Sequence, residues 1–116
     1  MVNKVNLLGN VGADPAVREV NETKVASFSL ATSESYKDKQ GNKVEKTEWH
    51  NLVVWGALAK VVESYVKKGD KLYVEGKISY RSYEDKEGQQ KHITEIKVTE
   101  LRMLSGKKDS PDKLPY

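Results

Sequence analysis

The chain has 116 residues, no cysteine and a formal net charge of +3, from 20 Lys and Arg against 17 Asp and Glu. This length fits one domain, and the lack of cysteine excludes disulfides, thiol nucleophiles and thiolate metal sites. With no signal-peptide pattern and no apolar run near the ~20 residues of a membrane-spanning helix, we expect a cytoplasmic protein. The basic excess is compatible with a polyanionic partner.

Strands are predicted along most of the chain by a two-residue alternation of apolar and polar side chains. The first is Val5–Val11, followed by a turn at Asp14-Pro15 and a short extension over residues 17–20. The same alternation recurs in four further segments, 26–31, 49–55, 72–81 and 94–99. Two polar segments between strands, 33–46 and 84–90, are predicted to be long loops.

One segment has the period of a helix instead. Its apolar residues follow the spacing i, i+3, i+4, i+7, i+8 and are Leu58, Val61, Val62, Tyr65 and Val66. We expect this helix to end at Lys67-Lys68-Gly69, with cations in its last turn and a C-cap glycine.

The element order predicts the fold. Five main strands with one α-helix between strands 3 and 4 are typical of the OB-fold, an all-β five-stranded Greek-key barrel. We therefore expect residues 1–105 to form one OB-fold domain, followed by a short flexible C-terminal tail over residues 106–116.

Catalytic patterns are missing from the sequence. The two histidines, His50 and His92, belong to no HExxH or HxH cluster, and there is neither a GxxxxGK[ST] phosphate loop nor a GxGxxG turn. The acidic residues are interleaved with lysines in polar segments, which favours solvated surface. We therefore expect a protein that is not an enzyme, with no metal and no cofactor.

Four aromatic residues indicate a binding surface. Trp49 and Trp55 lie six residues apart on one strand and so project from the same face. Tyr36 lies in the first polar segment, among lysines, and Tyr83 lies at the root of the second, shortly after Arg81. Rings in the core, or packed on their own loops, are the alternative. Rings interleaved with cations are typical of a groove for single-stranded nucleic acid, in which bases stack on the rings.

Several segments resemble the bacterial-type single-stranded DNA-binding protein family. The resemblance covers residues 2–104 in the right order and spacing. The matching segments are Asn3-Lys4-Val5, Leu8-Gly9-Asn10, Asp14-Pro15, Ala31-Thr32-Ser33-Glu34-Ser35, Thr47-Glu48-Trp49-His50, Lys68-Gly69-Asp70 and Val74-Glu75-Gly76.

The resemblance implies an OB-fold subunit of a homotetramer that coats single-stranded DNA in replication, recombination and repair, in the cytoplasm and associated with the nucleoid. It implies that His50 lies at a subunit interface. By the resemblance, the base-stacking residues are Tyr36, Trp49, Trp55 and Tyr83. The phosphate contacts that it implies are Lys4, Arg18, Lys37, Lys39, Lys67, Lys68 and Arg81.

The chain departs from the family pattern at a few positions. Tyr36 and Tyr83 stand where tryptophan is common, and Trp55 stands where phenylalanine is common, so stacking is retained. Asn51 and Ser82 occupy positions that are often basic in the family, so its phosphate contacts there are not carried over to this chain.

The end of the chain, Leu114-Pro115-Tyr116, resembles the tip by which the family recruits replication and repair proteins, although Lys113 interrupts the acidic run before it. A different class of function is an OB-fold adaptor of the primosome type, which would bind DNA weakly and a protein partner strongly. The retention of all four aromatic positions argues against the adaptor.

Overall fold

The computed structural model describes residues 1–104. The predicted tail, with Leu114, Pro115 and Tyr116, lies outside the described residues. Within them, no helix is long and apolar enough to cross a membrane. The elements in chain order are β1 (Val5–Val11), β2 (Ala16–Val20), β3 (Thr23–Lys37), β4 (Lys43–Trp55), α1 (Ala57–Tyr65), β5 (Lys71–Glu84) and β6 (Gln90–Met103).

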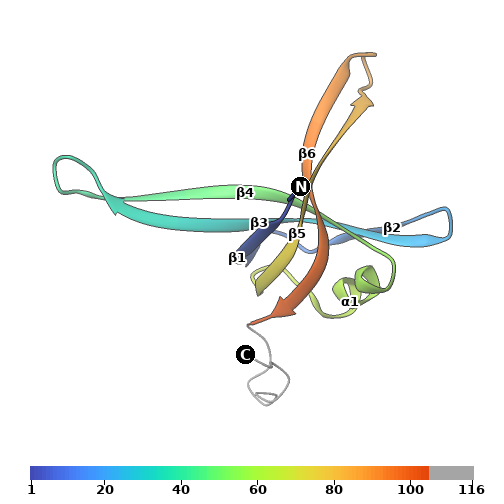
Figure 1. The fold of residues 1–116 in the computed structure, drawn as a ribbon, viewed down its shortest axis with the longest axis horizontal. Helices are drawn as coiled ribbons and strands as arrows, with labels where there is room; N and C mark the ends of the chain where they lie inside the picture. Colours follow the sequence, from blue (N-terminus) through green and yellow to red (C-terminus); the bar gives the residue numbers. More distant parts are fainter. Residues whose placement is uncertain (105–116) are drawn as a thin grey trace.

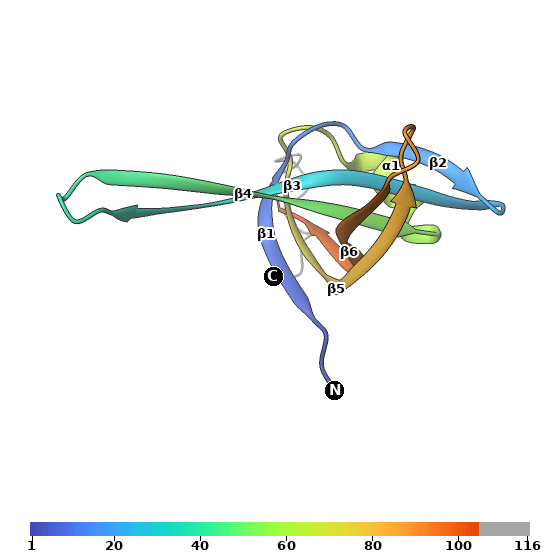
Figure 2. The same ribbon diagram turned by 90° about the horizontal axis from the view of Figure 1, so that it is seen from above.

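The strands form one sheet that closes into a barrel (Figures 1 and 2). The strand order is β1-β5-β6-β4-β3-β2, and an additional β1–β3 pairing closes the ring, with β2 left on the edge of β3. The β4–β6 pairing is parallel and the other pairings are antiparallel. Because β2 is the short extension of the first strand, the helix lies between the third and fourth main strands, and the predicted OB-fold is confirmed.

The core lies inside the barrel and is capped at one end by α1. Along β3 and β4 the even-numbered residues point inward, and Leu30, Leu52 and Val54 are fully buried. Ala59 and Val62 of α1 join the same apolar cluster. Each such side chain contributes about 1.5–3 kcal/mol by burial, so the inward face of these two strands holds the barrel together.

The end of the helix differs from the prediction. Helix α1 ends at Tyr65, its last turn holds no basic residue, and Val66 rather than a glycine is the cap residue, in an extended conformation. The amide of Lys68 donates to Asp14 Oδ1 at 2.8 Å, which draws the chain toward the β1–β2 connection. Gly69, at φ +91°, then turns the chain into β5, so its left-handed conformation serves the turn and not the helix.

The prediction of a long loop over residues 33–46 is also wrong. Strands β3 and β4 continue through it as a long two-stranded ribbon, and only residues 38–42 connect them (Figure 1, left). Polar cross-strand pairs stabilise the ribbon: Ser33 Oγ and Thr47 Oγ1 are 3.0 Å apart, and Glu34 lies opposite Lys46. The polar composition therefore indicated solvent exposure and was mistaken for a lack of strand.

The second polar segment is a connection close to its predicted position, but it is a short hairpin loop over residues 85–89 and not a long loop. Strand β5 ends at Glu84 and β6 begins at Gln90. The β5–β6 hairpin leaves the barrel in a different direction from the β3–β4 ribbon (Figure 1, top). The fold therefore presents two projecting hairpins beside the outer wall of the barrel.

Candidate nucleic-acid interface

Both tryptophans are on the surface of the barrel. Trp49 and Trp55 are 62% and 42% exposed. They alternate along β4 with inward-facing Leu52 and Val54, so they occupy the outward face of the strand. The prediction that they share a face is confirmed, and the alternative of core packing is excluded for both. Large exposed indoles on one strand are unusual for surface that only faces water.

A row of paired residues places a cation on each side of Trp55. In register, Arg18 on β2 lies opposite Val25 on β3, and Val25 lies opposite Trp55 on β4. Cross-strand partners share a face, so Arg18 lies about 10 Å from Trp55 across two strand spacings. On the other side of the ring, Lys97 Nζ of β6 is 5.9 Å from its centroid, within the range of a cation–π contact.

The outward face continues along the β5–β6 hairpin to Tyr83. On β5 this face carries Lys77, Ser79, Arg81 and Tyr83 in alternation. The guanidinium carbon of Arg81 is 5.9 Å from the centroid of the Tyr83 ring. We call this outward face of β4, β6 and β5, from Trp49 through Trp55 to Tyr83, the aromatic strip.

Arg81 is held by an acid on the neighbouring strand. Its Nε and Nη2 donate to the two carboxylate oxygens of Glu95 at 3.0 and 3.1 Å. These hydrogen bonds raise the pKa of Arg81 further above its ordinary value, so the pair stays ionised. Arg81 was predicted to contact phosphate. In the structure its guanidinium is instead paired with the carboxylate of Glu95.

Trp49 rests against the backbone at the end of β1. A Cβ atom added to Gly12 would lie only 2.4 Å from Cζ3 of the indole, so Gly12 leaves just enough space for the ring. The adjacent Val11 carbonyl accepts the amide hydrogen of Gly69, at 2.8 Å, from the turn that carries Lys67 and Lys68. Both lysines are exposed, and this turn brings two predicted phosphate contacts to the end of β1 where Trp49 packs.

Tyr36 is not part of the aromatic strip. It is exposed near the end of the β3–β4 ribbon, opposite Val44. Along β3 it alternates in phase with buried Leu30, which places it on the other face of the ribbon from Trp49. Lys37 and Lys39 are exposed beside it. The structure therefore separates one predicted stacking residue from the other three.

The tips of the two projecting hairpins are built alike, a relationship that sequence reasoning missed. The segments 35–39 and 82–86 read Ser-Tyr-Lys-Asp-Lys and Ser-Tyr-Glu-Asp-Lys. In each case one further residue and then a glycine follow, Gly41 and Gly88. Asp38 Oδ1 accepts backbone amides of the residues two and four positions on, and Asp85 Oδ1 does the same, all at 2.8–2.9 Å. Each tyrosine thus precedes the same rigid turn, and the repeated letters were the signal for it.

Lys4 belongs to a separate network on β1 and β5. Its Nζ is 3.4 Å from Glu75 Oε1, and the hydroxyl of Tyr73 donates to Glu75 Oε2 at 2.6 Å. Asn6 Nδ2 donates in turn to the Tyr73 hydroxyl at 2.8 Å. The bond from Tyr73, followed by Lys4, lowers the pKa of Glu75 below its ordinary value, so this carboxylate keeps its charge and its hold on Lys4.

His50 lies half-buried on β4, with Nε2 2.8 Å from Thr32 Oγ1. This contact packs the His50 ring against Thr32 of the neighbouring strand β3.

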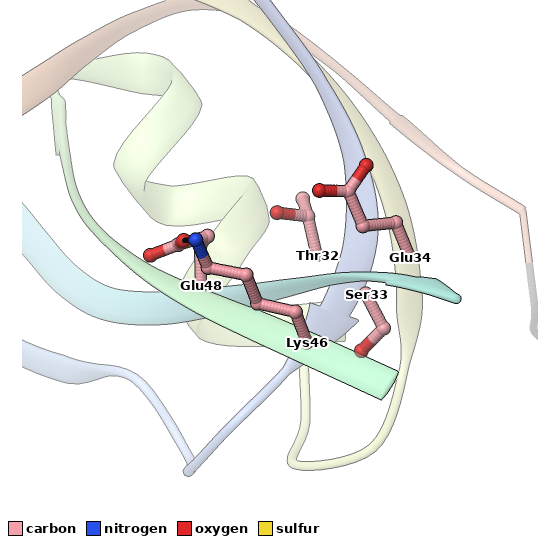
Figure 3. A pocket seen from close by; sticks show the side chains of 5 residues that line it. All are labelled: Thr32, Ser33, Glu34, Lys46 and Glu48. Atoms are coloured by element: carbon pink, nitrogen blue, oxygen red, sulfur yellow. Dashed lines mark ion pairs between the residues drawn. The ribbon is translucent and has the colours of Figure 1, made fainter. Parts of the chain in front are cut away.

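An open hollow lies on the β3–β4 ribbon, next to Thr32 (Figure 3). Its lining residues are Thr32, Ser33, Glu34, Lys46 and Glu48. Figure 3 shows the Lys46 side chain extended across to Glu48, with which it forms an ion pair of 3.3 Å. With two carboxylates and one ammonium the hollow repels phosphate, so we do not include it in the interface. No group of three or more potential ligands in residues 1–104 is placed to hold a metal ion.

Comparisons with known proteins agree on one family. Residues 2–104 match the model described as the single-strand binding protein family. Single-stranded DNA-binding protein 1 of Xylella fastidiosa is 46% identical over 111 residues, which cover 94% of this chain and 82% of that protein. The single-stranded DNA-binding protein of Bacteroides thetaiotaomicron is 51% identical over 109 residues, covering 91% of this chain and 68% of the relative.

A solved structure has the same fold. The chain superimposes on a structure described as Plasmodium falciparum SSB in complex with ssDNA, with a TM-score of 0.82 and 35% sequence identity. The match covers 90% of this chain and 97% of the other.

Proposed function

Because this chain belongs to the single-strand binding protein family, we propose that it binds single-stranded DNA without sequence preference and without catalysing a reaction. The observation that carries the proposal is the aromatic strip, where Trp49 and Trp55 are exposed on one barrel face with Arg18 and Lys97 on the two sides of Trp55. Bases stack on such rings whatever their identity, and cations pair with the phosphates.

We assign base stacking to Trp49, Trp55 and Tyr83 on the aromatic strip, and to Tyr36 on the β3–β4 ribbon. The strip offers successive rings to one strand of DNA, since Trp49 and Trp55 are about 20 Å apart along β4. Tyr36, near the end of the β3–β4 ribbon, would meet the DNA beyond the aromatic strip.

The cations fall into two groups. We assign phosphate pairing to Arg18, Lys37, Lys39, Lys67 and Lys68, which are all exposed. Lys4 and Arg81 each have a carboxylate partner, so their contribution to phosphate binding is reduced. The binding is electrostatic in part and weakens as salt displaces the protein from the phosphates.

The family also supports a homotetramer, with His50 at a subunit interface, that acts in replication, recombination and repair in the cytoplasm, at the nucleoid. Light scattering of the purified chain measures the assembly directly. A mass four times that of the chain supports the tetramer, and a monomer contradicts it.

The decisive experiment is a titration with oligo-dT followed by tryptophan fluorescence at low salt. We expect quenching, because stacked bases cover Trp49 and Trp55. The quenching should be reproduced by a single strand of mixed sequence and should be much weaker with duplex DNA. An absence of quenching by oligo-dT at low salt contradicts the proposal.

A further inference from the structure

Two lysines lie directly opposite each other beside Trp55. Lys77 on β5 is the register partner of Lys97 on β6, so their Cβ atoms are about 4.5–5.5 Å apart on the same face. The next strand along, β4, brings Trp55 to the other side of Lys97, whose Nζ lies 5.9 Å from the ring centroid. Three adjacent strands thus set two ammonium groups next to one exposed indole.

Neither lysine is neutralised within the part of the chain that the structure describes. The ion pairs found in residues 1–104 involve other cations, and none of them includes Lys77 or Lys97. The carboxylate nearest along β6 is Glu95, two residues from Lys97 on the same face, and Arg81 occupies both of its oxygens. The two positive charges therefore face each other without an anion between them.

Such a pair carries a cost that an anion removes. Like charges directly opposite each other in a sheet destabilise it, whereas a bound phosphate is attracted by both. A second like pair, Lys37 opposite Lys43, lies at the end of the β3–β4 ribbon, but no ring contact is found there among the described residues. Among residues 1–104, only the Lys77–Lys97 pair combines this repulsion with a stacking surface.

We propose that Lys77 and Lys97 form a phosphate clamp beside Trp55, which holds the backbone phosphates of the nucleotide whose base stacks on that ring. This proposal rests on the proposed function and deepens it, because it assigns phosphate binding to two residues on the aromatic strip. On the aromatic strip, the clamp supplies the phosphate binding that is reduced at Arg81 by its ion pair with Glu95.

The test measures the salt dependence of oligo-dT binding for K77Q, K97Q and the double variant. For a single strand, each phosphate contact contributes about 0.7 to the slope of log affinity against log salt. Because affinity falls as salt rises, the slope is negative. We expect each single substitution to reduce its magnitude by about 0.7 and the double substitution to reduce it by about 1.4. Between 50 and 200 mM salt, the wild type then loses about 7-fold more affinity than the double variant.

The matched control is K60Q, which removes one exposed lysine from α1, away from the strip. It should keep the wild-type slope. Thermal melting checks the fold, and we expect K77Q and K97Q to melt at or above the wild-type temperature because one of two repelling charges is gone. Wild-type slopes in the double variant overturn the clamp and leave the proposed function standing, whereas a wild-type protein that does not bind oligo-dT overturns both.

A second measurement separates phosphate binding from an effect on the indole. In one alternative, Lys97 acts only by holding the Trp55 ring through the cation–π contact. An oligo-dT with an uncharged methylphosphonate backbone decides between the two, because it retains the bases and lacks the phosphate charge. The clamp predicts that K97Q binds this probe as the wild type does and that K97R restores binding to ordinary oligo-dT. An equal loss of affinity for both probes overturns it.

Discussion

Arg81 and Glu95 form a two-point ion pair between neighbouring strands, with nitrogen–oxygen distances of 3.0 and 3.1 Å. The Glu95 side chain is only 13% exposed, and the Arg81 guanidinium also lies over the Tyr83 ring. A guanidinium held in this way is a rigid support for the ring. The pair therefore gives Arg81 a positioning role for Tyr83, and it lowers the positive charge that this part of the strip presents to DNA.

Replacing Glu95 by glutamine tests whether its charge limits the positive charge that Arg81 presents to DNA. E95Q keeps one oxygen to accept a hydrogen bond from Arg81 but removes the negative charge. We expect tighter binding of oligo-dT at low salt and a slope of log affinity against log salt that is steeper by up to about 0.7. The matched control is E63Q, which removes the carboxylate partner of Lys24 at α1 and should leave the slope unchanged. An unchanged slope in E95Q would show that Glu95 does not limit the charge available to DNA.

The four aromatic residues should contribute unequally. Stacking of one base on an aromatic side chain is worth about 1–3 kcal/mol, so W49A and W55A should each weaken oligo-dT binding by about 5- to 150-fold. Y36A should cost less, because its ring is smaller and lies off the aromatic strip. Y65A is the control, since Tyr65 on α1 is exposed to a similar degree, at 64% against 52% for Tyr36. Equal losses for Tyr36 and the two tryptophans would contradict the ranking.

Gly12 should control the position of Trp49. In G12A the new methyl group would lie 2.4 Å from Cζ3 of the indole, so the ring must move. We expect weaker binding of oligo-dT and a shifted tryptophan emission spectrum. The double-mutant cycle provides the control: in a W49A background, G12A should cause no further loss of affinity. A full additional loss there would mean that Gly12 acts on binding without Trp49.

Acid should weaken the β1–β5 network. The pKa of Glu75 is lowered below 4.5 in the folded chain, first by the hydroxyl of Tyr73 and then by Lys4. A carboxyl group with a lowered pKa stabilises the fold above its unfolded pKa and loses that contribution as the pH falls through its folded pKa. The melting temperature of the wild type should therefore fall below about pH 4.5 more steeply than that of E75Q. Parallel curves for the two proteins would contradict this role of Glu75.

Much of the barrel was predictable because its signal is local. The alternation in Ala26, Phe28 and Leu30 reports directly which residues face the core, since side chains of a strand alternate between its faces. The same rule placed Trp49 and Trp55 together. The limits of the elements were harder to predict, because Lys67 and Lys68 favour a helix end by composition, while a contact from Asp14, more than fifty residues away, keeps the amide of Lys68 outside the helix.

The sequence by itself determined the element order, the family, and the aromatic and basic residue types that single-stranded DNA requires. Only the tertiary structure decided which of these side chains act together. Strand register brings Lys77, Lys97 and Trp55 from three strands into one site and ties Arg81 to Glu95, while it places Tyr36 on another face. The physical reason is that these contacts join residues distant in the chain, and their pairing depends on barrel closure and on a bulge at Glu75 and Gly76, which no local pattern records.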